Sequence, residues 1–408
     1  MNRILGIFSL VYAADGFTLV LLPLLALQIS DSALFVSVVH FCRTSPWLLL
    51  SLPVGKFIDM RGAIFAFKLG QYLRVSVLTF SVVYLSFSTD NYTAQMLLLV
   101  AAFFVGVGEV VSDNASQAML PQLFEPEQML AVNSKVHSLE TLLSYFVAPP
   151  VAAFLFADSL INGLYICIIS YAFALVIFVW ATKAQSASEK VSTAKDAQQS
   201  IWAGWRILRR SKVLNALMTT TCISNFVLAG LTAILPFYII HELGEDESLY
   251  GMALSVYAVG FVISANSANR ITQGFNQYKI LQWIIALFPL PFLIVILFPH
   301  LFTLYISLFI LGLLIGVWGC ITVTYRQTYT PPFLLGRVNA SFRMLSWGAM
   351  PLGALLAGLL SDRFNVEWFL MIALVMTLPM WYFIRFLNIH HITRDQRFLT
   401  KCSNVGIL

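Results

Sequence analysis

The sequence predicts an all-α membrane protein in which twelve transmembrane helices form two pseudo-symmetric bundles of six. Three features predict this fold class: the composition, the repeated apolar stretches and a polar segment near the middle of the chain. Hydrophobic residues make up 59% of the 408 residues, and charged residues make up only 11%. Soluble domains carry about 25% charged residues, so the composition excludes an ordinary soluble protein.

Apolar stretches long enough to cross a bilayer, which takes about 20 residues each, recur along the whole chain. Each of them must be helical, because a lone strand leaves its backbone polar groups unpaired in lipid. The predicted spans are 4–29, 33–54, 64–88, 95–118, 130–157, 160–182, 213–240, 249–268, 280–298, 302–325, 338–360 and 367–388.

The middle of the chain has linker composition, because residues 183–200 are polar, rich in Ser and Ala and free of large apolar side chains. The sequence SIWAGWRILRRSK follows, with Trp and Leu at helical spacing beside several Arg, and predicts an amphipathic helix on the inner leaflet. We therefore expect an N-terminal bundle at 1–182, a cytoplasmic linker with this helix at 183–212, a C-terminal bundle at 213–390 and a cytoplasmic tail at 391–408.

The charged residues between the predicted helices fall on two sides, with Lys and Arg gathered almost wholly on the side of both termini. The positive-inside rule makes that side cytoplasmic, so the formal charge of +5 needs no nucleic-acid partner to explain it. The five cysteines show no paired spacing, and four of them lie within apolar segments. They predict neither a disulfide framework nor a metal site, and we expect no cofactor.

The two halves resemble each other weakly but in the same order. DSALFVS at 31–37 corresponds to ESLYGMA at 247–253, and AVNSK at 131–135 corresponds to RVNAS at 337–341. Two related sets of six helices are typical of secondary transporters, whose substrate site lies near the midplane.

The sequence GKFIDMRG at 55–62 resembles the signature loop of the major facilitator superfamily, with Gly55, Asp59 and Gly62 in matching positions beside Arg61. The resemblance implies a role for this loop in gating, although Met60 stands where the family usually has a basic residue. DNASQAMLPQLFEPEQMLAVNS at 113–134 and the long stretch at 325–360 further resemble the macrolide efflux and enterobactin exporter subfamily. This resemblance implies the major facilitator fold, a bacterial inner membrane and a siderophore or drug-like cargo.

The segment APPVAA at 148–153 stands where exporters of the superfamily often carry proline with paired glycines. Proline removes a helical hydrogen bond, and alanine keeps the small size that close helix contact requires. An ordinary kinked and tightly packed helix explains the segment equally well, but the resemblance favours export.

Five ionisable side chains lie inside the apolar stretches of the first half: Asp15, Arg43, Arg74, Glu109 and Glu140. Each lies roughly ten to thirteen residues from its predicted cytoplasmic end, about 15 to 20 Å along a helix. Charges at this depth normally pair with each other or mark a pathway for ions or substrate. Three carboxylates oppose two guanidiniums, which predicts either one protonated carboxyl or a cationic substrate group.

These considerations assign roles to individual residues. Proton-coupling candidates are Asp15, Glu109, Glu140 and His137, where a purely structural role for the His137–Glu140 pair stays open. Arg74 is expected to form a structural ion pair with Glu109 or Asp113, because the family places the third helix away from the cavity. Substrate or charge-partner candidates are Arg43, Asn225, Tyr257, Trp318, Arg343 and Trp347.

The sequence thus predicts a secondary transporter that exports a small amphipathic compound in exchange for protons, and we expect it to act as a monomer. Two alternatives stay open: a proton-coupled uptake permease, and an uncoupled lipid-handling or sensor protein of the membrane. An enzyme is not expected, because the chain shows no nucleophile elbow, HExxH motif or phosphate-binding glycine loop.

Overall fold

The computed structural model of the chain describes residues 2–87, 90–123, 132, 135–136, 139–156, 159–181, 202–330 and 332–387. The regular structure in these residues is entirely helical. The chain divides into two compact units: unit 1 comprises Met1–Gln198 with Ala233–Ser255, and unit 2 comprises Gln199–Thr232 with Val256–Leu408. The predicted boundaries at 182 and 213 stay a prediction, and the expected tail at 391–408 lies outside the described residues.

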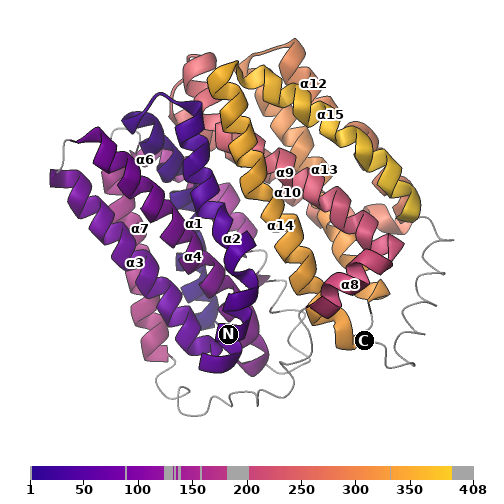
Figure 1. Cartoon of the computed structure of the whole chain (residues 1–408), viewed down its shortest axis with the longest axis horizontal. Coiled ribbons are helices and arrows are strands. Elements are labelled where there is room, and N and C mark those ends of the chain that lie inside the picture. The colour runs from indigo at the N-terminus through magenta and orange to yellow at the C-terminus, as the bar shows by residue number, and fades with distance from the viewer. Residues whose placement is uncertain are drawn as a thin grey trace. The chain divides into compact units, whose positions relative to one another are not determined.

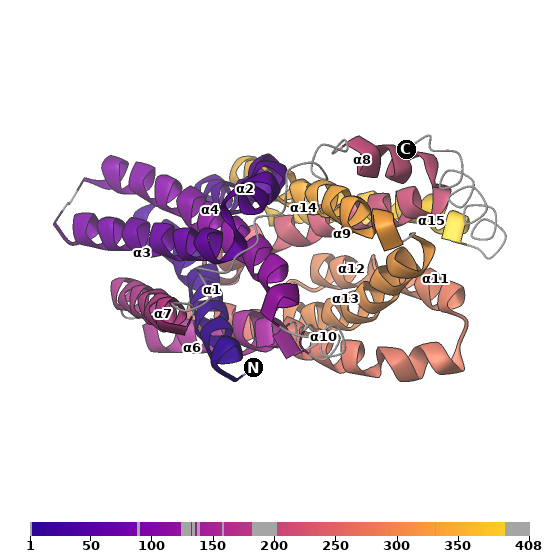
Figure 2. The ribbon, with the colours of Figure 1, turned by 90° about the horizontal axis from the view of Figure 1, so that it is seen from below.

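Unit 1 is a bundle in which α1 is the central helix. Figure 2 shows α1 between α2 and α4 on one side and α6 and α7 on the other, and α1 contacts all four. The rings of Phe8, Phe67 and Phe178 join α1, α3 and α7, with 4.4 Å between the centroids of Phe67 and Phe178. The helices are α1 (Asn2–Ile29), α2 (Ala33–Arg61), α3 (Ala63–Phe87), α4 (Asn91–Leu123), the π-helical η2 (Thr141–Val147), α6 (Ala148–Phe156) and α7 (Leu160–Ala181) (Figure 1).

Unit 2 is also helical, and its helices contact one another mainly through α13, α14 and α15. The amphipathic helix α8 packs against α14 and buries Ile207 and Leu208, while Trp205 and Arg209 stay exposed. The elements after the linker are α8 (Trp202–Arg210), α9 (Lys212–Phe237), η3 (Tyr238–Glu242), α10 (Ser248–Gly274), α11 (Gln277–Leu287), α12 (Leu290–Leu297), α13 (Leu301–Tyr329), α14 (Pro332–Arg363), α15 (Val366–Ile384) and η4 (Arg385–Leu387).

Ten of the described helical segments are long and apolar enough to cross a membrane. They correspond to ten of the twelve predicted spans, and one of them, Gln277–Leu297, is interrupted between α11 and α12 beside Pro289 and Pro291. The 25-residue α3 is not among the ten, and the described apolar part of the predicted fifth span is only Leu142–Ala152. The count of twelve therefore rests on the sequence for these two helices.

The outer surface of the helices carries large apolar side chains. Phe80 and Trp180 are each 64% exposed in unit 1, and Trp283 and Phe302 are 69% and 74% exposed in unit 2. Soluble monomers rarely expose such side chains in quantity, so these surfaces suit contact with lipid chains.

The segment predicted as a gating loop is mostly helical. Gly55, Asp59 and Arg61 lie in α2, which continues seven residues past the predicted end of the span at residue 54. Gly62 ends the helix with a positive φ of 87°, and its N–H donates to the carbonyl of Ile58 at 2.8 Å. Glycine suits this position because residues with a Cβ are strained there. Only Gly62 thus forms the turn into α3.

Candidate functional site

The buried charges of unit 1 surround one cavity. Its empty volume, including the open mouth, is about 340 Å³. The structure brings the predicted Asp15, Arg43, Glu109 and Glu140 together around this space, whereas Arg74 lies behind it. The lining residues are Tyr12, Asp15 and Leu19 from α1, Arg43 from α2, Glu109 and Asp113 from α4, and Glu140, Ser144 and Tyr145 from the segment that enters η2.

Asp15 is the acceptor of a buried polar cluster between α1, α3 and α7. Its Oδ1 accepts hydrogen bonds from Nη1 of Arg74 at 2.9 Å and from the hydroxyl of Tyr171 at 2.6 Å. The Arg74 guanidinium lies 5.0 Å from the centre of the Tyr171 ring, and the whole Arg74 residue is 0% exposed. A charge-assisted hydrogen bond of this kind is short and strong, so this carboxylate is held firmly in place.

The predicted partner of Arg74 was therefore wrong. We expected Glu109 or Asp113 on the adjacent helix α4, but the guanidinium reaches past α4 to Asp15 on α1. Gly108 makes this path possible, because a Cβ at that position would lie 2.6 Å from Cγ of Arg74. Asp113, which is four residues after Glu109 and on the same helical face, lines the cavity instead.

A second ion pair joins α2 to α4 at the cavity wall. Nη2 of Arg43 lies 3.3 Å from Oε2 of Glu109 and 3.4 Å from the backbone carbonyl oxygen of Asp15. The side chains of Arg43 and Glu109 are 11% and 23% exposed, so this pair borders the open space. Gly106 allows the two helices to approach, because a Cβ there would overlap the carbonyl oxygen of Arg43.

Another part of the cavity wall comes from the segment around Glu140 and Ser144, which packs against α1. Gly16 allows close approach to it, since a Cβ at Gly16 would lie 2.7 Å from the Ser144 carbonyl oxygen and 2.6 Å from Cβ of Ala148. The Ser144 hydroxyl donates to the carbonyl of Tyr12 at 3.0 Å. This segment is π-helical, a form that occurs frequently at functional sites. His137 lies outside the described residues, so its predicted role stays a prediction.

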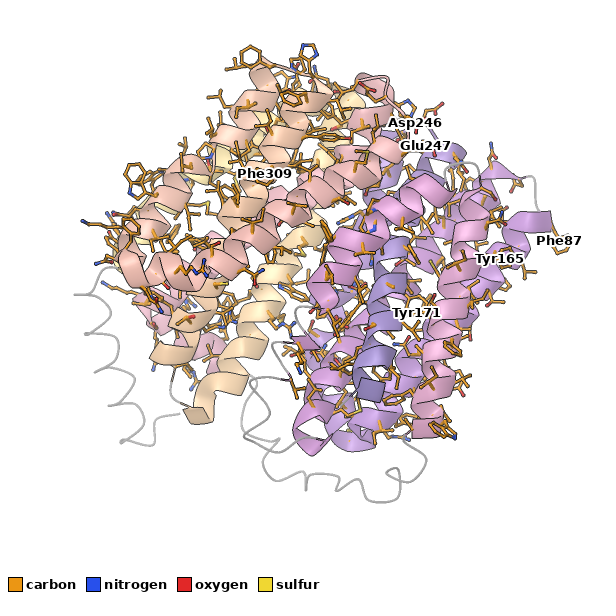
Figure 3. All side chains as sticks on the ribbon, turned by 180° about the vertical axis from the view of Figure 1, so that it is seen from behind. Phe87, Tyr165, Tyr171, Asp246, Glu247 and Phe309 are labelled. Carbon is orange, nitrogen blue, oxygen red and sulfur yellow. The ribbon has the colours of Figure 1, made fainter. Side chains whose placement is uncertain are left out.

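Sequence reasoning missed two kinds of residue at this site. Tyr171 lies in the middle of the apolar α7 and is fully buried, whereas Tyr165 on the same helix is 44% exposed (Figure 3). A tyrosine at membrane depth needs a hydrogen-bond partner when it is buried, and that requirement was the available signal. The second kind is the pair of glycines Gly106 and Gly108 on α4, which allow Arg43 and Arg74 to pack closely against this helix. Two glycines this close together in an apolar helix were the available signal for close helix contacts.

The candidates in unit 2 lie on four helices, α9, α10, α13 and α14. Asn225 on α9 donates from Nδ2 to the carbonyl of Ser346 on α14 at 2.8 Å, and Arg343 on α14 lies 4.5 Å from the ring centre of Trp347. Tyr257 on α10 packs its backbone carbonyl against Gly312 of α13. Trp318, further along α13, is 4% exposed, and its indole N–H has no hydrogen-bond partner within the described part of the chain.

Within the described residues, no group of three or more His, Cys, Asp or Glu side chains is arranged to hold a metal ion. The cavity in unit 1 is therefore best described as an arrangement of carboxylates and guanidiniums. Such a set can hold protons or charged organic groups.

A family model described as a transmembrane secretion effector of the major facilitator type matches residues 19–398. The chain belongs to this family. The family consists of transporters, so the chain is a multi-pass membrane transporter with a small-molecule substrate and not an enzyme.

Three relatives of this transporter are named for what they carry. The multidrug efflux pump Tap of Mycolicibacterium fortuitum is 24% identical over 358 residues, which are 86% of each chain. Macrolide efflux protein A of Streptococcus pyogenes is 24% identical over 67% of this chain and 69% of that protein. The staphyloferrin A transporter of Staphylococcus aureus is 22% identical over 82% of this chain and 83% of that protein.

The fold of the transporter is that of solved major facilitator structures. A bacterial homologue of the iron transporter ferroportin, in an inward-facing state, has a TM-score of 0.76 and 16% identity, and the match covers 94% of this chain and 97% of that one. The all-helical major facilitator fold predicted from the sequence is confirmed by this likeness and by the family match.

Proposed function

We propose that this transporter exports a small amphipathic compound, drug-like or siderophore-like, by proton antiport through alternating access. The observation that carries the proposal is the cavity in unit 1, where Glu140 meets Asp15, Arg43 and Glu109, and these last three lie inside apolar helices. Ionisable groups are costly at this depth and are retained mainly for ion or substrate pathways. Carboxylates that line an accessible cavity are suited to taking up and releasing protons.

The names of the relatives support the outward direction. Two are efflux proteins, for several drugs and for macrolides, and one carries the siderophore staphyloferrin A. We accordingly propose export rather than uptake, the inner membrane of a bacterium as the location, both termini in the cytoplasm, and a monomer as the working form.

The proposed roles follow the geometry of each unit. In unit 1 the carboxylates handle protons, and Arg43 holds Glu109 or an anionic group of the cargo. In unit 2 the aromatic and amide side chains shape the pocket for the cargo, and their chemistry suits a ring-bearing compound. The proposed candidates there are Asn225, Tyr257, Trp318, Arg343 and Trp347. The segment from Gly55 to Gly62 is proposed to take part in the cytoplasmic gate.

Transport by the purified protein in proteoliposomes tests this function. A panel of macrolides, dye-like drugs and siderophores is loaded, a proton gradient is imposed, and the movement of each compound is compared with that in protein-free vesicles. We expect at least one compound to move against the direction of proton flow. Accumulation in the direction of proton flow would instead identify an uptake permease.

Carboxylate variants test the coupling separately. Asp15→Asn, Glu109→Gln and Glu140→Gln are compared with Asp90→Asn, which removes an exposed carboxylate before α4. We expect Asp90→Asn to keep the pH dependence of export, and at least one cavity variant to lose it. If all three variants export normally with unchanged pH dependence, proton coupling through Asp15, Glu109 and Glu140 is wrong.

A further inference from the structure

The carboxylates around the cavity differ in how they are held. Asp15 is bound by Arg74 and Tyr171, and Glu109 is bound by Arg43. Asp113 also lines the cavity, but within the described residues its carboxylate receives no hydrogen bond and no ion pair. The one hydrogen bond at this residue goes from the Ser116 hydroxyl to the backbone carbonyl of Asp113, at 2.9 Å.

The groups that face Asp113 make a free negative charge there costly. Glu109 stands one turn before it on α4, Asp15 and Tyr12 face it from α1, and Glu140 faces it from the segment before η2. Arg74 is the cation that faces it from α3, but Arg74 donates to Asp15. An ionised carboxylate in a low-dielectric site requires a counter-charge. Asp113 therefore needs either a proton or a cation from outside the protein.

We propose that Asp113 is the exchange carboxylate of the cavity, which takes alternately a proton and the cationic group of the transported compound. The cargo is then an organic cation, such as an amphipathic amine. This proposal deepens the proposed function and rests on it for the direction of transport. Asp15 and Glu109 are positioning residues under this proposal, since their ion pairs with Arg74 and Arg43 fix the walls around Asp113.

The exchange balances in charge. A proton that arrives from outside binds a carboxylate oxygen of Asp113 and neutralises it, which removes the partner of the bound cation and releases the cargo outward. Loss of the same proton to the cytoplasm restores the carboxylate, which then binds the next cation. One positive charge enters for each positive charge that leaves.

Infrared spectroscopy of the purified full-length transporter in lipid tests the assignment without any knowledge of the cargo. A protonated carboxyl group in an apolar site gives its own carbonyl stretching band, which disappears as the group ionises. We expect this band in the wild-type protein and in Glu109→Gln, a matched variant one turn away on α4. We expect the band to be lost in Asp113→Asn. Persistence of the band in Asp113→Asn, or its loss in Glu140→Gln instead, would overturn the assignment.

A second variant distinguishes loss of the Asp113 carboxyl group from misfolding of Asp113→Asn. Asp113→Glu keeps the carboxyl group but lengthens the side chain, so the band must remain and its position or pH midpoint must shift. An unchanged band and midpoint in Asp113→Glu would place the titrating group elsewhere.

A pair of probes with the same shape and opposite charge tests the cation. We expect tetraphenylphosphonium to remove the carbonyl band of the wild-type protein at a pH where the group is half protonated, and tetraphenylborate to leave the band in place. If both ions removed the band equally, or if neither ion changed it, the proposal that the cargo is a cation would be overturned. If the band behaves as expected but proteoliposomes show no proton-driven export, the proposed antiport fails while the assignment of Asp113 stands.

Discussion

The contact between α2 and α4 in unit 1 and the contact between α10 and α13 in unit 2 use the same packing device for different chemistry. In unit 1 Gly106 lies against the carbonyl of Arg43, and in unit 2 Gly312 lies against the carbonyl of Tyr257. Because glycine has no side chain, the helix backbones approach each other closely in both places. In unit 1 the approach brings an ion pair to a cavity, because Arg43 meets Glu109.

In unit 2 the neighbouring contacts are uncharged. Gly316 of α13 lies against the carbonyl of Phe261 and the hydroxyl of Ser264, which is 3.4 Å from the carbonyl oxygen of Gly312. The close backbone contact is therefore present in both units, while the ion pair accompanies it only at the α2–α4 contact of unit 1. Close packing and charge therefore vary independently between these two contacts, and four predictions test this conclusion.

The largest expected effect follows from breaking the buried pair of unit 1. Arg74→Met removes the partner of Asp15 and leaves a buried carboxylate without its cation, which costs about 3 to 5 kcal/mol of stability. We expect a strongly lowered apparent unfolding temperature in detergent and loss of the monodisperse peak in size-exclusion chromatography.

The control for this change is Arg270→Met, which alters an exposed arginine of unit 2 and should stay within about 0.5 kcal/mol of wild type. The double variant with Asp15→Asn should recover part of the loss, because the carboxylate that Arg74 neutralised is then absent. Wild-type stability of Arg74→Met alone would show that the pair does not hold unit 1 together.

The sequence predicted the positions of most spans because hydropathy records which residues can lie in lipid. It placed the end of the second span at residue 54, although α2 continues to Arg61. Hydropathy marks only the part of a helix that crosses the bilayer, whereas Gly62 marks the end of the helix itself. The gating segment was consequently described as a loop when it is mostly helix.

The sequence also identified which charges meet, but it did not identify their pairing. Glu109 and Asp113 lie four residues apart and therefore share one helical face, yet spacing within α4 carries no information about the rotation of α1 and α3. That rotation turns Arg74 toward Asp15 and leaves Asp113 facing the cavity. The ion-pair partner of Arg74 depends on the relative rotation of α1, α3 and α4. The sequence alone does not specify these rotations.

The second prediction concerns the glycine contacts that the two units share. Gly106→Ala and Gly312→Ala each place a methyl group against a backbone carbonyl, and overpacking of this kind costs about 1 to 3 kcal/mol. Gly319→Ala on α13 is the matched control, because a Cβ there meets nothing within 4 Å. Thermal unfolding in detergent measures all three. If only one of Gly106→Ala and Gly312→Ala were less stable than wild type, the two glycine contacts would not be equivalent in the two units.

A third and smaller effect is expected at Asn225, which lies on the seventh predicted span as Asp15 lies on the first. Asn225→Ala removes the hydrogen bond to the Ser346 carbonyl and should cost about 0.5 to 1.5 kcal/mol. Asn225→Asp should be less stable at neutral pH, because an ionised carboxylate has no hydrogen to donate. Its stability should rise as the pH falls, because the protonated carboxyl can donate to that carbonyl. Thermal unfolding of Asn225→Asp in acidic and in neutral buffer measures this change in stability. An unfolding temperature of Asn225→Asp that does not depend on pH would contradict the prediction.

The smallest effect is expected outside the membrane, at the start of α4. Asp90 precedes the helix, and its Oδ2 accepts hydrogen bonds from the hydroxyl of Thr93 and from the backbone N–H of Thr93 at 3.0 Å. These bonds, the hydroxyl bond first, lower the pKa of Asp90 below its usual value of 3.8.

Because the pKa of Asp90 is lower in the folded state, its stabilising effect is complete above about pH 3.8 and is lost as the pH falls through the folded value. We expect Asp90→Asn to remove this acid-dependent part of the unfolding curve, with a small decrease in unfolding temperature at neutral pH. Asp31→Asn removes another exposed carboxylate, whose side chain is 91% exposed and whose Oδ1 lies 3.9 Å from Nε2 of His241, and it serves as the control for the loss of one surface charge. If Asp90→Asn and wild type lost stability identically as the pH falls, the hydrogen bonds from Thr93 to Asp90 would not contribute to folding stability. Unlike the buried charges of unit 1, a carboxylate in this position is solvated in both states, and so its removal tests the helix end without disturbing the cavity.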